Sequence, residues 1–162
     1  MKSENFQFTF NVYEGEGELP IADAALLQAA RKATSDAYAP YSNFLVGAAA
    51  MLANGQLITG SNQENASFPA GICAERVLLS AAAALYPRVN IITMAVSYNN
   101  LLGGSTSPIS PCGICRQSLT EREVNAKQPL RLILAGLSGK VYVIPSVSWL
   151  LPLAFDSSFF GK

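Results

Sequence analysis

The sequence predicts one layered α/β domain whose central sheet mixes antiparallel and parallel strands. Strand-like and helix-like segments alternate along the chain, which is typical of helices packed on a sheet. An Asn54-Gly55 turn joins two neighbouring strand-like segments and predicts an antiparallel hairpin. The later strands are connected through helices, so we expect these crossovers to be parallel. At 162 residues, with no internal repeat or linker, the chain fits a single domain.

Residues 6–12 are expected to form the first strand. Their apolar side chains occur at every second position, a period that predicts one buried face. These side chains are Phe6, Phe8, Phe10 and Val12. The acidic and glycine-rich run 14–18 ends the segment. We therefore divide the chain into an N-terminal extension, 1–18, and a domain, 19–162, with a phenylalanine-bearing tail.

The first helix is predicted from Pro20 to about Ala37. Proline is favoured in the first turn of a helix, and the stretch that follows is rich in alanine. Pro40 stops the helix. Two strands at 45–52 and 56–61 then form the hairpin.

A helix, a strand and a further helix follow. Pro69 and Gly71 break the path of the chain, and residues 73–86 are predicted to form a helix rich in leucine and alanine. The continuous apolar run 91–97 is typical of a strand buried on both faces. Residues 112–124 are predicted to be helical again.

Two strands and a short helix complete the domain. Residues 130–135 and 140–144 favour strands, and a Ser138-Gly139 turn joins them. The short helix is expected around 146–151.

The charge balance excludes several classes of partner. Eleven basic and eleven acidic residues cancel, and no basic run is longer than Arg31-Lys32. A nucleic-acid or anionic-membrane binder would carry a basic patch, so we expect neither partner. The substrate is expected to be a small, nearly neutral molecule.

The chain is apolar for its size, with 50% hydrophobic and 14% charged residues against about 25% charged in an average domain. Part of this apolar surface is therefore expected to lie between subunits. An alanine-rich monomer is the alternative, because alanine raises the hydrophobic content without making adhesive patches.

The chain holds three cysteines and no histidine. An odd number of cysteines does not complete a disulfide framework, and no apolar leader segment opens the sequence. We therefore expect a reducing, cytoplasmic environment in which the thiols stay free.

Cys73, Cys112 and Cys115 are candidate ligands of one zinc ion. Both cysteine groups stand at predicted helix starts, where the helix dipole favours the thiolate that binds metal. Tetrahedral zinc with three protein ligands keeps one corner for water, which is the arrangement of a catalytic site. A structural zinc completed by a carboxylate or by a partner chain is the alternative for these cysteines.

Glu75 and Arg76 follow the first cysteine closely. Zinc draws the pKa of bound water down to about 7, and a carboxylate two residues from a ligand is near enough to take that proton. Three thiolates on a dication leave a net negative charge, which Arg76 can offset. Considered alone, Glu75 would be a first-turn helix acid and Arg76 a surface cation. A chain without histidine cannot be a serine–histidine or cysteine–histidine hydrolase.

Cys73-Ala74-Glu75 followed by Pro111-Cys112-Gly113-Ile114-Cys115 resembles the pattern of zinc-dependent nucleoside deaminases. The three-cysteine form is similar to the small cytidine deaminases. The supporting stretches lie within residues 20–156, and they are 38–48, 62–76, 110–117 and 150–155.

The resemblance implies a three-layer α-β-α cytidine deaminase-like fold with a five-stranded mixed sheet, to which the N-terminal extension could add a strand. It also implies one Zn²⁺ per subunit and a homotetramer with shared active sites. The implied reaction is hydrolytic deamination of cytidine and deoxycytidine to uridine and deoxyuridine, with release of ammonia, as a step of pyrimidine salvage. Glu75 would carry the water proton to N3 while the water oxygen adds to C4.

The resemblance assigns three residues to the sugar side of the substrate. Asn62 and Glu64 would hold the ribose 3′-hydroxyl, and Phe44 would pack on the nucleoside. A site built for that hydroxyl rejects analogues that lack it, so nucleosides should be preferred over free bases. Outside this family, Asn62 and Glu64 would be solvated turn residues and Phe44 a core aromatic.

On the base side, the resemblance assigns the Ala74 N–H and the Ser110 carbonyl to the pyrimidine. Phe155 would enter from a neighbouring subunit, although by itself it could be an ordinary core or interface aromatic. Phe68 stands where relatives commonly carry tyrosine, so one hydroxyl of a cross-subunit contact is missing.

Three other functions compete with this interpretation. Deaminases of blasticidin-type nucleoside antibiotics share the metal pattern but lack the Asn62–Glu64 arrangement. Polynucleotide editing would need a basic track for the strand, which this neutral chain does not offer. A non-catalytic assembly module would use zinc only to pin its helices together.

Overall fold

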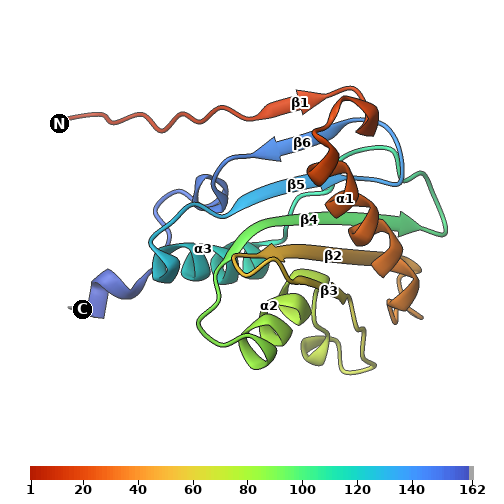
Figure 1. Cartoon of the computed structure of the whole chain (residues 1–162). Coiled ribbons are helices and arrows are strands. Elements are labelled where there is room, and N and C mark those ends of the chain that lie inside the picture. The colour runs from red at the N-terminus through yellow and green to blue at the C-terminus, as the bar shows by residue number, and fades with distance from the viewer. Residues whose placement is uncertain (161–162) are drawn as a thin grey trace.

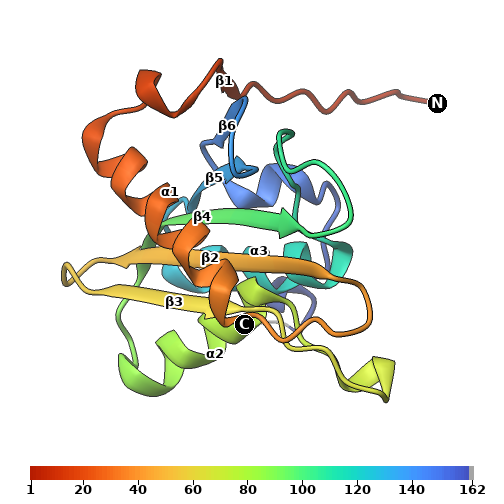
Figure 2. The same ribbon diagram turned by 90° about the vertical axis from the view of Figure 1, so that its right-hand side faces the viewer.

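A mixed sheet of six strands forms the middle layer of the computed structural model, which describes residues 1–160. The helix α1 (Ile21–Ala33) covers one face, and α2 (Ala74–Leu85) and α3 (Gly113–Ala126) cover the other (Figures 1 and 2). The α/β class and the three layers are thereby confirmed. None of the helices within the described residues is long and apolar enough to cross a membrane.

The sheet has the strand order β1-β6-β5-β4-β2-β3, one strand more than the five expected. Its strands are β1 (Asn11–Tyr13), β2 (Phe44–Leu52), β3 (Leu57–Ser61), β4 (Ile91–Asn100), β5 (Arg131–Ala135) and β6 (Val141–Ile144). β4 and β5 pair in parallel through the α3 crossover, and the other neighbours are antiparallel. The predicted hairpin and the parallel crossover are both confirmed.

Alternating side chains of β2 face two separate cores. Ala48 and Ala50 pack with α2 and α3, whereas Ala49 packs with α1. Gly47 brings α1 close to the strand, since a Cβ there would lie 2.1 Å from the carbonyl oxygen of Ala30. These small residues let helices approach both faces of the sheet closely.

The central strand β4 is buried on both faces, as its apolar run predicted. Met94 and Val96 belong to the core under α2 and α3, and Ala95 belongs to the core under α1. This strand separates α2 from α3 in the sequence and fixes both helices on the same face of the sheet (Figure 1).

Two predicted helices differ from the structure in extent. α1 ends at Ala33 and continues as a 3₁₀ turn (Thr34–Asp36), four residues earlier than the predicted end. The Thr34 and Ser35 hydroxyls donate to the carbonyls of Arg31 and Lys32, which satisfies groups that a longer α-helix would use. Near the C-terminus the expected short helix is a 3₁₀ turn, Val147–Leu150.

The N-terminal segment forms less strand than residues 6–12 predicted. Only β1 pairs with the sheet, along the edge of β6, and the phenylalanines before it are exposed, Phe6 by 56%. The prediction of a buried face was wrong because β6 ends at Ile144 and leaves the preceding residues without a partner strand. We refer to residues 1–10, which run on past the sheet in Figure 1, as the N-terminal arm.

Candidate metal centre

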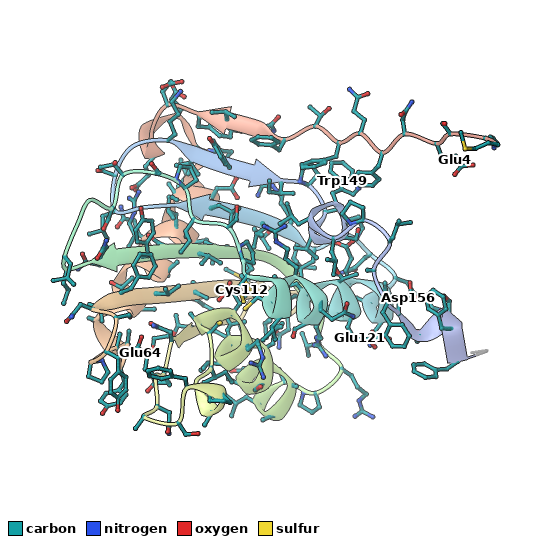
Figure 3. All side chains as sticks on the ribbon, turned by 180° about the vertical axis from the view of Figure 1, so that it is seen from behind. Glu4, Glu64, Cys112, Glu121, Trp149 and Asp156 are labelled. Carbon is teal, nitrogen blue, oxygen red and sulfur yellow. The ribbon has the colours of Figure 1, made fainter. Side chains whose placement is uncertain are left out.

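Two helix starts bring the three cysteines together. Cys73 is the N-cap of α2, Cys112 is the N-cap of α3, and Cys115 lies in the first turn of α3. Gly60 of β3 lets the start of α2 approach the sheet, because a Cβ there would lie 2.7 Å from the Ala74 carbonyl oxygen. Figure 3 shows the sulfur atoms gathered at Cys112, at the start of α3.

The spacing of the sulfur atoms fits one tetrahedral zinc ion. All three lie within 4.8 Å of one another, and those of Cys73 and Cys112 are 3.7 Å apart. With zinc–sulfur bonds of about 2.3 Å, two corners of a tetrahedron are about 3.8 Å apart. The three thiols are free rather than joined in a disulfide. Within residues 1–160, no further cysteine, histidine or carboxylate belongs to the group, so the chain contributes three ligands.

The thiols influence one another electrostatically. A hydrogen bond from Cys115 is the main factor that lowers the pKa of Cys73 to about 6, and Arg76 adds a smaller effect in the same direction. The same interaction with Cys73, together with burial, raises the pKa of Cys115. Of the pair Cys73 and Cys115, Cys73 therefore forms the thiolate more readily. A bound dication would favour all three thiolates, so the donor set suits a metal ion.

Glu75 lies in the first turn of α2 and is only 4% exposed. Burial raises the pKa of its carboxyl group, while hydrogen bonds from its own backbone N–H and from the Cys115 thiol oppose that rise. This carboxyl group is not part of the ligand group, and its contact with Cys115 leaves it beside the cysteines.

Residues 62–65, the polar segment before α2, are held against the cysteine cluster by a backbone bridge. Gln63 exchanges two backbone hydrogen bonds of 2.9 Å with Ile72, the residue before Cys73. On its other side Gln63 bridges in parallel to Tyr38. The sequence contains no sign of this role, because the bridge uses only main-chain atoms.

The side chain of Asn62 is bound on both of its polar atoms by β2. Its Oδ1 accepts from the Val46 N–H at 2.7 Å, and its Nδ2 donates to the Phe44 carbonyl at 2.9 Å. Asn62 is therefore not a solvated turn residue. It ties the polar segment to the strand that carries Phe44.

Glu64 is held by the loop before β2. Its Oε2 accepts from the backbone N–H of Tyr41 at 2.9 Å and of Ser42 at 3.2 Å. A hydrogen bond from the Ser42 side chain and these two backbone bonds lower the pKa of the carboxyl group. Tyr41 and Ser42 thus fix an ionised Glu64, a role that their place in a loop did not reveal.

A cavity of about 330 Å³ joins this polar segment to the cysteine cluster. Its size is at the lower end of the range for small-molecule sites. Its lining residues come from the loops before α2 and β2, and they are Tyr41, Asn62, Gln63, Glu64, Asn65, Phe68, Gly71, Ile72 and Cys73. The rings of Tyr41 and Phe68 meet edge to face at 5.8 Å within it. Tyr41 was not among the predicted site residues.

Four predicted substrate contacts do not line this cavity. Phe44 stacks on Tyr98 at 4.8 Å, and Ala74 is buried in the first turn of α2. Ser110 is exposed just before the cysteine-bearing helix α3. The fourth contact, Phe155, lies in the C-terminal tail.

Phe155 does not line the cavity of its own chain. Its ring is 57% exposed and stacks on Phe159 at 5.4 Å. Its carbonyl accepts a hydrogen bond of 2.7 Å from the Gln117 side chain of α3. In Figure 3 the adjacent Asp156 lies beyond α3, on the side opposite to Glu64.

Comparison with known proteins accounts for this arrangement. Residues 20–127 match the family described as the cytidine and deoxycytidylate deaminase zinc-binding region. The chain is a member of this deaminase family. The matched range contains all three cysteines and Glu75, and it begins after the N-terminal arm.

Individual relatives of this deaminase family are similar over most of the chain. A cytidine deaminase of Halalkalibacterium halodurans is 38% identical over 132 residues, which are 82% of this chain and 92% of the relative. The crystal structure of a cytidine deaminase from Burkholderia pseudomallei is 41% identical, with a TM-score of 0.70 over 81% of this chain and 97% of that one. A Mycobacterium leprae cytidine deaminase structure is 32% identical, with a TM-score of 0.64 over 82% and 99%.

Proposed function

We propose that this chain hydrolytically deaminates cytidine and deoxycytidine to uridine and deoxyuridine, with release of ammonia, and that it does so with one Zn²⁺ per subunit. The observation that carries the proposal is the group of three thiols within 4.8 Å of one another beside the buried Glu75. The similarity to proteins named cytidine deaminase supports the substrate class. Turnover of these nucleosides belongs to pyrimidine salvage.

Glu75 is the residue that moves protons in this proposal. Cys73, Cys112 and Cys115 would hold a zinc ion, which would supply a Lewis acid that makes water a nucleophile near neutral pH. Glu75 takes one proton of the attacking water and delivers it to N3 of the pyrimidine as the oxygen adds to C4. It then takes the proton of the new C4 hydroxyl and gives it to the amino group, which leaves as ammonia while the C4 carbonyl forms. Arg76, which already favours the Cys73 thiolate, offsets the charge of the three thiolates.

The substrate is positioned by groups on both sides of the cysteine cluster. Asn62 and Glu64 at the cavity wall bind the ribose 3′-hydroxyl, and the backbone bonds that fix them prepare them for it. The Ala74 N–H lies in the first turn of α2, where N–H groups have no partner in the helix, and it binds the base with the Ser110 carbonyl. Phe44 completes the site by packing on the nucleoside.

Ammonia release tests this proposal directly. Purified zinc-loaded protein should release ammonia from both nucleosides, lose this activity to a chelator and regain it when zinc is returned. Deamination of blasticidin but not of cytidine would replace the proposal with an antibiotic deaminase. Zinc binding without deamination of either substrate would leave only the assembly module.

We also propose a homotetramer in which Phe155 enters the cavity of a neighbouring subunit. Its exposure and its position outside its own cavity support a role in another copy. The groove between α2 and α3 offers a surface for that neighbour, and it combines Leu79 and Ala83 with the charged side chains of Arg76, Glu121 and Arg122.

Subunit mixing tests the shared site. Glu75→Gln and Phe155→Ala should each be nearly inactive alone, whereas mixed oligomers should regain activity where a Phe155 of one subunit meets a Glu75 of another. If subunit exchange is verified and the mixture is still inactive, Phe155 does not belong to the site of a neighbouring subunit.

We assign the protein to the cytoplasm and divide it into an extension, 1–18, and a deaminase-like domain, 19–162. Three free thiols within 4.8 Å of one another suit a reducing compartment. The family match beginning at residue 20 supports the boundary. Imaging of the tagged protein and expression of residues 19–162 alone test these assignments.

A further inference from the structure

The N-terminal arm offers an open strand edge outside the part of the chain that matches the family. Residues 5–13 carry no charge, no proline and no glycine. All of residues 1–10 are exposed, and no backbone hydrogen bond joins residues 5–9 to another residue of the described chain. Such a segment presents a full row of donors and acceptors to a second strand.

The phenylalanines follow one another along the arm at about the two-residue repeat of an extended strand. The ring centroids of Phe6 and Phe8 are 6.2 Å apart, and those of Phe8 and Phe10 are 6.0 Å apart. Two of these rings also contact the domain. The ring centroids of Phe8 and Trp149 are 6.2 Å apart, and those of Phe10 and Tyr142 are 5.1 Å apart. The arm therefore has one apolar face fixed on the domain and one free backbone edge.

We propose that this edge pairs antiparallel with the arm of a second copy, with Phe8 opposite Phe8 at the two-fold axis. This register places Phe6 opposite Phe10. It also brings Lys2, which pairs with Glu4 in its own chain, towards Glu14, which lies in the bend after β1 and pairs with Lys140. Opposite charges therefore lie at both ends of the uncharged stretch. A two-fold axis satisfies both arms with one interface.

Neighbouring registers fit less well. A shift by one position places phenylalanines opposite Gln7 or Thr9 and mixes the two faces of the strands. A shift by two positions in one direction places Glu4 opposite Glu14, and like charges opposite each other destabilise a pair. A shift by two in the other direction places Glu4 against Phe10. The self-complementary sequence therefore favours a copy of this chain over an unrelated partner.

The contact would join two sheets at the edge that lies farthest from β3. β1 is the terminal strand at this edge, whereas the cavity is lined by residues 41–73. The pairing can thus occur without covering the proposed substrate site. It goes beyond the proposed function and can be tested without an activity assay.

Disulfide cross-linking tests the register. In the zinc-loaded full-length protein, Phe8→Cys should give a covalent dimer under mild oxidation, since paired Cα atoms of antiparallel strands are about 4.5–5.5 Å apart and within disulfide range. Glu4→Cys alone should remain uncross-linked, because two such residues would be about 27 Å apart at about 3.4 Å per residue. Mixing Glu4→Cys with Val12→Cys should restore the covalent dimer.

A charge exchange at the same position tests the association itself. Phe8→Glu and Phe8→Lys should each weaken self-association through the arm at least about fivefold in sedimentation experiments, because like charges then meet at the axis. An equimolar mixture of the two variants should recover it. Both exchanges lie on the exposed arm, and circular dichroism and zinc content should be unchanged.

The proposal is overturned by any of three results. These are the absence of a Phe8→Cys dimer, equal cross-linking of Glu4→Cys alone, and a charge-exchanged mixture that associates no better than its components. The last result would indicate that the arm binds the body of another copy or a different chain. Loss of deaminase activity would bear only on the proposed function, since neither readout depends on turnover.

Discussion

The metal centre and the N-terminal arm are both regular sets of side chains, but only the metal centre is held from two sides. Cys73 and Cys112 stand at the starts of two helices that pack on the same face of the sheet. The arm phenylalanines touch Trp149 and Tyr142 on one side and expose their backbone edge on the other. The cysteines form a defined site because two separate core helices hold them. The phenylalanines lie on one segment, which leaves its backbone edge open to a partner.

The largest effect is expected at Glu75, the side chain that we propose carries protons at the metal centre. Glu75→Gln should lower kcat for cytidine by about 10²–10⁴-fold, because the general base and acid are lost together. Bound zinc should stay near one per subunit, because Glu75 is outside the ligand group. Ammonia release and metal analysis measure the two quantities.

The matched control for this exchange is Glu18→Gln, the same change at an exposed position whose carboxylate accepts from the Glu14 N–H. Its kcat should stay close to that of the wild type. Near-normal activity of Glu75→Gln would show that Glu75 is not the general base.

Removal of the metal should affect the stability of the centre next most strongly. A ligand that binds only the folded state stabilises it by about 4 kcal/mol when its free concentration is about a thousand times Kd. Chelation should therefore lower the Tm of the wild type, but it should not change that of Cys112→Ser, which lacks one ligand. Equal shifts for both proteins would show that the three thiols do not hold the ion.

Asn62→Ala tests whether the cavity wall is fixed by β2. The substitution removes two hydrogen bonds, to Val46 and Phe44, and should cost about 1–3 kcal/mol of unfolding free energy. Asn125→Ala on the surface of α3 serves as a control and should change stability by less than about 0.5 kcal/mol. Similar losses for the two variants in urea unfolding would argue against a fixed wall.

Glu64 should contribute a small pH dependence. Hydrogen bonds lower its pKa in the folded protein below the ordinary value of 4.5. Its contribution to the free energy of unfolding is therefore fully present above the pKa of the unfolded state. That contribution is lost as the pH falls through the lower pKa of the folded state. Urea unfolding of the wild type and Glu64→Gln from about pH 6 to about pH 3 should show their difference shrinking at the acid end. A constant difference would contradict the interaction.

The smallest effect on the metal centre is expected from the arm. Deletion of residues 1–10 should leave the zinc content and the Tm shift on chelation unchanged, since the arm lies at the opposite edge of the sheet from β3. Loss of metal from the truncated protein would show that the two regions are not separate.

Much of the fold could be predicted because each element has a local cause. Asn54-Gly55 specified the hairpin, and Gly55 has the positive φ of 81° that this turn uses. The extent of the first helix was overestimated because Thr34 and Ser35 satisfy its last carbonyls with their own hydroxyls. The arm was overestimated because alternation of side chains does not reveal whether a partner strand is present.

The cysteine group could be predicted because its residues are few and chemically unambiguous. The supports of the cavity could not, since Gln63 acts through main-chain bonds and Glu64 is held by the backbone of Tyr41 and Ser42. Long-range main-chain pairing depends on how loops meet, and residue type alone carries little information about it. The proposed contact of Phe155 is with the cavity of another subunit, which a single chain does not contain. Its entry into that cavity therefore stays a prediction.

The position of β4 between the two cysteine-bearing helices has a consequence for biosynthesis. The ligands meet where β4 lies in the sheet and α2 and α3 pack on the same face of it, and residues of the leucine and alanine core make those contacts. We therefore expect a newly synthesised chain to fold before it is loaded. Cells short of zinc would then accumulate folded apoprotein that can be activated later, rather than chains for degradation.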